Sequence, residues 1–285
     1  MLPSEAHSLT LNQQSAHLRR WAARIETSSF LVKEVAERLF ERLDLMKLLP
    51  DRLLDLGHPF YSLSPLLQKR YPSAFLLTYN PFVTPKKRAR WFRRSVTDNV
   101  IHAERTRLPL ADESLDLVIA HNVIASSQER RHLWDECYRL LKPEGLLLFS
   151  TFGPDTLKEW REAEQSFSDY IPSPFSDMHD IGDELLAKGF ADPVIDRESL
   201  TIFYAHFAVL LKDLRANNLS FRKKKYLSRA YVNHMQQAYS AHLSPEGHLP
   251  MTAEILYGHA WKVPKRNKEQ GNEVSIPLTA IKKSK

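Results

Sequence analysis

Short apolar runs alternate with amphipathic stretches along the first half of the chain, and this alternation most constrains the fold. The runs lie at residues 53–57, 74–79, 115–120 and 145–151. Apolar residues at helical spacing lie between the last two, at residues 128–141. Strands that alternate with helices predict βαβ units and a mostly parallel sheet. Because the last apolar run is uninterrupted, it is typical of a sheet covered by helices on both faces.

The pattern changes after residue 154, where charged helical stretches become more frequent. A helix over 181–188, ended by Gly189, precedes a strand candidate over 195–204. Two further helices are expected near 206–216 and 222–242, and a last strand over 255–261. We therefore expect an N-terminal extension (1–27), one α/β domain (28–262) with a helical part at about 155–250, and a mobile tail (263–285).

Composition narrows the classes of function. The chain has 285 residues, a formal net charge of +6 and a pI of about 9.3, which favours acidic partners. Its single cysteine excludes an internal disulfide and a cysteine-based zinc cluster, and no HExxH spacing suggests a metal. No apolar run reaches the length of a membrane span and no signal core is visible, so we expect a cytoplasmic protein without membrane contact.

The turn after the first apolar run opens like a nucleotide-binding strand-turn-helix. Asp55 and Gly57 stand where such a turn begins, but His58-Pro59-Phe60-Tyr61 follow where more glycines are expected. Glycine lets a ligand approach the backbone closely, whereas proline removes a donor and aromatic rings add bulk. The next strand candidate ends at Thr78 with no carboxylate for ribose hydroxyls. Two interpretations remain open: a modified site with a displaced ligand, or a turn that fills its own pocket.

Several longer segments carry a resemblance to a known family. They are 108–118 (LPLADESLDLV), 136–145 (ECYRLLKPEG), 177–183 (DMHDIGD), 189–194 (GFADPV) and 257–261 (YGHAW). With these segments the chain resembles the class I S-adenosylmethionine-dependent methyltransferases. It is most similar to the malonyl-acyl-carrier-protein O-methyltransferases of biotin synthesis and their mitochondrial complex I assembly relatives.

The resemblance implies a Rossmann-like α/β fold with a mostly parallel seven-stranded sheet, bound S-adenosylmethionine and a helical cover over the substrate. Since the acceptor would already be a carboxylate, no catalytic base is assigned. Carried over by position, the cofactor-binding residues would be Asp55, Gly57, Thr78 and Glu104, and the substrate-side residues His121 and Asn122.

A basic stretch at 85–94 interleaves cations with Trp91 and Phe92, and 221–226 forms a second one. Such a stretch could be a solvated helix face, could dock an acyl-carrier protein or another acidic protein, or, less favoured, could contact nucleic acid. Its cations are Lys86, Lys87, Arg88, Arg90, Arg93 and Arg94.

Two hypotheses about function follow. One is an S-adenosylmethionine-dependent O-methyltransferase acting on a malonyl group of a carrier protein, with an impaired cofactor site. The other is a catalytically inactive relative that binds or assembles with an acidic protein.

Overall fold

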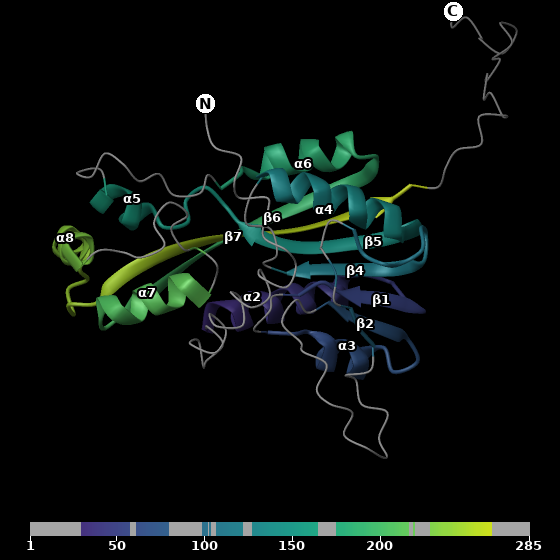
Figure 1. Cartoon of the computed structure of the whole chain (residues 1–285), viewed down its shortest axis with the longest axis horizontal. Coiled ribbons are helices and arrows are strands. Elements are labelled where there is room, and N and C mark those ends of the chain that lie inside the picture. The colour runs from purple at the N-terminus through teal and green to yellow at the C-terminus, as the bar shows by residue number, and fades with distance from the viewer. Residues whose placement is uncertain are drawn as a thin grey trace, which may run out of the picture.

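A seven-stranded sheet forms the centre of the molecule. The computed structural model describes residues 30–57, 61–79, 99–101, 103, 107–121, 127–164, 175–216, 219 and 229–263. Within these residues the strand order is β3-β2-β1-β4-β5-β7-β6, with β7 antiparallel to both of its neighbours and the other neighbouring pairs parallel (Figure 1). The strands are β1 (Arg52–Asp55), β2 (Phe75–Tyr79), β3 (Val100–Ile101), β4 (Leu115–His121), β5 (Leu141–Phe152), β6 (Phe190–Tyr204) and β7 (Leu249–Lys262). This arrangement confirms the predicted α/β fold and mostly parallel seven-stranded sheet.

The helices expected over 128–141, 181–188 and 206–216 are present, with ends shifted by at most three residues. The described helices are α2 (Phe30–Glu41), α3 (Ser64–Arg70), α4 (Ser127–Leu140), α5 (Lys158–Glu164), α6 (Met178–Ala187), α7 (Phe207–Ala216) and α8 (Arg229–Tyr239), with 3-10 turns η2 (Arg42–Leu45) and η4 (Ser240–His242). Gly189 follows α6 with φ +94°, as expected of a glycine that ends a helix. None of the described helices is long and apolar enough to cross a membrane.

Helices cover both faces of the sheet, as the uninterrupted apolar strands predicted. Successive strand residues point to opposite faces, so each strand supplies two cores. Leu53, Leu117, Ile119, Leu146 and Leu148 lie in the core shared with α2, α3, α5, α7 and α8. Leu54, Val118, Ala120, Leu147 and Phe149 lie in the core shared with α4 and α6.

The antiparallel pair β6–β7 extends past the end of β5. Phe152, the last residue of β5, pairs with Ile255, so the earlier half of β7 pairs with β6 alone. Helices α5, α7 and α8 gather around this extension at one end of the molecule (Figure 1). They are joined by an aromatic cluster in which Trp160 stacks on Phe207 at 5.7 Å between ring centroids and Tyr239 lies 6.0 Å from both.

Candidate functional site

The carboxyl ends of β1, β2 and β4 form the candidate site. Asp55 ends β1, where it is in register with Thr78 on β2 and with Ile119 on β4, two residues before His121. Gly57 follows Asp55 directly. The structure therefore brings together four of the six residues that the resemblance assigned. Ligands of open parallel sheets bind at this edge, next to the strands where the order reverses.

A linked set of hydroxyl groups is hydrogen-bonded to Asp55, whose side chain is fully buried. Ser62 and Ser64 donate hydrogen bonds to Asp55 Oδ2 at 2.7 and 2.8 Å, and Ser64 Oγ lies 2.6 Å from Thr78 Oγ1. Because a hydroxyl has one proton to donate, Ser64 gives its proton to Asp55 and accepts the proton of Thr78. The Thr78 proton is thus used inside the protein. Ser62 and Ser64 were not predicted as site residues, although two hydroxyls soon after a strand-ending aspartate were a visible signal in the sequence.

The space in front of Gly57 is occupied by protein side chains. A Cβ atom added at Gly57 would lie 2.6 Å from His121 Nε2 and 2.7 Å from Asp55 Oδ1. His121 is fully buried. Burial lowers the pKa of His121, while the negative charge of Asp55 and a backbone hydrogen bond with Tyr61 act in the opposite direction. The imidazole is therefore neutral at pH 7. His121, expected on the substrate side, lies directly against the glycine of the cofactor turn.

Tyr61 connects this turn to α2. Its ring meets the His121 ring edge-on, with 6.3 Å between centroids and an angle of 80°. Its hydroxyl donates to Glu37 Oε1 on α2 at 2.8 Å. Burial raises the pKa of Tyr61 to about 12, and the bond to Glu37 and the charge of that carboxylate contribute. Tyr61 therefore stays a neutral donor and holds the turn against α2.

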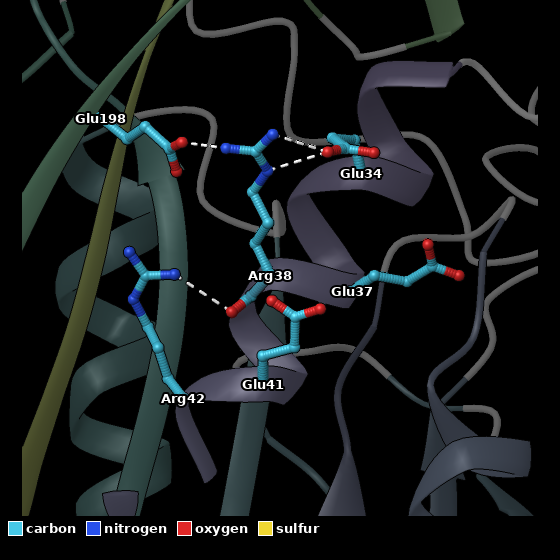
Figure 2. A pocket seen from close by; sticks show the side chains of 6 residues that line it. All are labelled: Glu34, Glu37, Arg38, Glu41, Arg42 and Glu198. Carbon is cyan, nitrogen blue, oxygen red and sulfur yellow. Dashed lines mark hydrogen bonds and ion pairs between the residues drawn. The ribbon is translucent and has the colours of Figure 1, made fainter. Parts of the chain in front are cut away.

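A charged hollow lies between α2 and β6, beside Glu37 (Figure 2). Arg38 pairs with Glu34 at 2.7 Å and with Glu198, and its guanidinium lies between the two carboxylates in Figure 2. Arg42 pairs with Asp196 at 2.7 Å. Because both guanidinium groups already have carboxylate partners, the hollow is no preformed anion site. Its lining residues are Glu34, Glu37, Arg38, Glu41, Arg42 and Glu198.

The other predicted site residues lie outside the described part of the chain, and their roles stay predictions. They are Glu104, Asn122, the six cations of the 85–94 stretch and the turn residues His58, Pro59 and Phe60. Across the described residues, no group of three or more side chains gathers in a way that could hold a metal ion.

The described residues, as they are arranged, fit S-adenosylmethionine less well than a ribose-binding carboxylate and an open glycine turn would. A nucleoside needs an acceptor for its ribose hydroxyls at the end of the second strand, usually a carboxylate. That end carries no carboxylate. Thr78 and Tyr79 donate their protons inside the protein, to Ser64 and, at 3.2 Å, to the Ala103 carbonyl, so they offer only the lone pairs of neutral hydroxyls as acceptors. A cofactor also needs open space at the first glycine, and that space beside Gly57 contains His121. The first condition is met only by uncharged acceptors, and the second fails on the side of Gly57 that faces His121.

Comparisons with known proteins place the chain in a family. The model of the methyltransferase domain matches residues 54–149. A malonyl-[acyl-carrier protein] O-methyltransferase of Gallionella capsiferriformans is 36% identical over 263 residues, which are 88% of this chain and 90% of that protein. Malonyl-[acyl-carrier protein] O-methyltransferase 1 of Coxiella burnetii is 34% identical over 98% of this chain and 99% of its own length.

A solved structure confirms the fold. A candidate methyltransferase of Bacillus halodurans superimposes with a TM-score of 0.54, covering 79% of this chain and 99% of its own, at 12% identity. The sequence relatives carry the assignment beyond the fold, because they match nearly the whole chain. This chain belongs to the malonyl-[acyl-carrier protein] O-methyltransferase family of class I methyltransferases, for which S-adenosylmethionine is the expected cofactor.

Proposed function

We propose that this chain is a malonyl-acyl-carrier-protein O-methyltransferase of the biotin-synthesis type in ancestry, with an impaired S-adenosylmethionine site. The names of its relatives and their identity over most of both chains support the ancestry. One observation supports the impairment: at the strand end where the ribose should be held stands Thr78, a neutral hydroxyl already hydrogen-bonded to Ser64, in place of a carboxylate. The acceptor would be the malonyl carboxylate on an acidic carrier protein.

The expected loss of cofactor affinity can be bounded. A hydrogen bond to a charged group contributes about 1.5–3 kcal/mol, and one between neutral groups about 0.5–1.5 kcal/mol. Replacing a ribose-binding carboxylate by Thr78 therefore costs about 1 kcal/mol for each of two hydroxyls. A loss of about 2 kcal/mol weakens binding about thirtyfold. Displacing the buried His121 imidazole adds to this.

The second candidate function is a catalytically inactive partner of an acidic protein. The packing of His121 against Gly57 supports it, since a chain that binds no cofactor can still use its surface. The net charge of +6 fits an acidic partner. The cations expected to make that contact belong to the 85–94 and 221–226 stretches, outside the described residues.

Methyl transfer and carrier binding, measured separately, test the proposal. Purified chain is incubated with malonyl-acyl-carrier protein and methyl-labelled S-adenosylmethionine from micromolar to millimolar, with the Gallionella relative as positive control. Methyl ester formation that saturates only at a cofactor concentration at least thirtyfold above that of the control supports an impaired enzyme. Saturation at the control's concentration contradicts the impairment.

A carrier-binding assay separates the two candidates. Fluorescence anisotropy of labelled malonyl-acyl-carrier protein is followed as this chain is added, at low and high salt. Salt-sensitive binding without methyl ester at millimolar cofactor supports the inactive partner. Neither binding nor methyl ester contradicts both candidates.

A further inference from the structure

We infer that His121, held in place by Tyr61 and Glu37, is the residue that decides how well this site admits an adenosyl ligand. The inference rests on the proposed function and deepens it, because it names the side chain that closes the site. The ligand class is a purine nucleoside with a thioether or sulfonium side chain, such as S-adenosylhomocysteine or S-adenosylmethionine.

Gly57 follows Asp55 and Leu56 and has no Cβ atom. The place where a Cβ would stand is 2.6 Å from His121 Nε2, closer than real Cβ atoms approach any heavy atom. A ligand atom in van der Waals contact with the Gly57 Cα on that side would overlap the imidazole. Glycine leaves backbone accessible for close approach of a ligand. Here the His121 ring occupies the space on that side of Gly57.

The imidazole is fixed from several sides. Asp55 lies on one side with Oδ1 close to Gly57, and the Tyr61 ring meets the imidazole edge-on. Tyr61 is in turn tied to α2 by its 2.8 Å hydrogen bond to Glu37. A buried ring in such packing moves only when its neighbours move. Binding of a ligand on this side of Gly57 therefore requires displacement of His121 together with Tyr61, and that displacement reduces affinity.

The missing carboxylate at Thr78 is an independent defect, on β2 rather than β4. If Thr78 alone limited binding, removing the imidazole would change nothing. If His121 limits binding, its removal tightens binding even with Thr78 in place. A carboxylate restored at Thr78 and a truncated His121 thus report on different defects.

The test is calorimetric titration of S-adenosylhomocysteine into the full chain. The variants are His121→Ala and Thr78→Asp, with His259→Ala as matched control, because His259 is a half-buried histidine on β7 of the same sheet. We expect His121→Ala to bind at least tenfold more tightly than the unsubstituted chain, and His259→Ala to bind equally. Circular dichroism and thermal melts verify folding. His121→Ser, which keeps a polar group, answers the same question if the alanine variant does not fold.

Each outcome has a distinct meaning. A folded His121 variant that binds no more tightly than the unsubstituted chain overturns the inference. If Thr78→Asp then tightens binding, the proposed impairment still holds and its cause lies at β2. Binding by the unsubstituted chain that is as tight as that of the Gallionella relative refutes both the impairment and the role of His121.

Discussion

Gly57→Ala is the substitution that most sharply probes the packing at the candidate site. The new Cβ would lie 2.6 Å from His121 Nε2 and 2.7 Å from Asp55 Oδ1, and both side chains are fully buried. Overpacking of this kind typically costs about 1–3 kcal/mol. Since neither neighbour is the free end of a flexible surface chain, we expect a loss of about 2 kcal/mol in the free energy of unfolding. Urea unfolding followed by circular dichroism measures it.

A double-mutant cycle with His121→Ala identifies the neighbour responsible. The alanine removes one of the two close contacts and leaves the one to Asp55, so the relief should be partial. We expect the two substitutions together to be less destabilising than the sum of their separate effects, by about 1 kcal/mol. Additivity within about 0.3 kcal/mol, or a Gly57→Ala variant as stable as the unsubstituted chain, would refute the reasoning.

Three further substitutions test the surrounding structure. Gly182→Ala should stabilise α6 by about 0.5–1 kcal/mol in urea unfolding, because alanine is the better helix former and the new Cβ would lie 3.9 Å from Ile195 Cδ1. A lower free energy of unfolding than that of the unsubstituted chain would contradict this. Arg130→Met should cost about 1–3 kcal/mol, because Glu184 loses its 2.7 and 2.8 Å bonds and keeps only Arg131 at 3.4 Å. A cost below about 0.5 kcal/mol would contradict this. Burial raises the pKa of Glu164 from 4.5 in the unfolded chain to about 7 in the folded protein. The protonated carboxyl therefore contributes fully to stability below pH 4.5, and this contribution is lost as pH rises through 7. Glu164→Gln should therefore gain stability relative to the unsubstituted chain between pH 5 and pH 8, by at most about 3 kcal/mol, and thermal melts showing an equal difference at both pH values would contradict this.

The parallel strands could be predicted from the sequence because they are apolar on both faces. The runs at 53–57, 74–79 and 115–120 correspond to β1, β2 and β4. The last two strands were predicted too short. In β7 the earlier half contains Thr252 and Glu254, which are polar and yet buried. The Thr252 hydroxyl donates to Glu159 on α5, and the Glu254 carboxylate accepts from the backbone N–H of Asp155 in the turn before α5. Such pairing across about 100 residues leaves no local pattern.

The candidate site shows the same limit at shorter range. Strand-end position alone brought Asp55, Thr78 and His121 together, because the carboxyl ends of parallel strands share one edge. Position could not show that the His121 side chain turns toward Gly57, nor that Ser64 links Thr78 to Asp55. Both depend on side-chain direction. The departures at the turn and at Thr78 were visible in the sequence, but the groups that fill the space were not.

The most direct measurement of the central claim is a calorimetric titration of the unsubstituted chain with S-adenosylmethionine, beside the Gallionella relative under the same conditions. We predict a dissociation constant at least thirtyfold above that of the relative. The reasons are the neutral Thr78 hydroxyl, hydrogen-bonded to Ser64, in place of a carboxylate, and the His121 imidazole beside Gly57. Equal dissociation constants for the two proteins would contradict the account, and would mean that the turn opens at little cost.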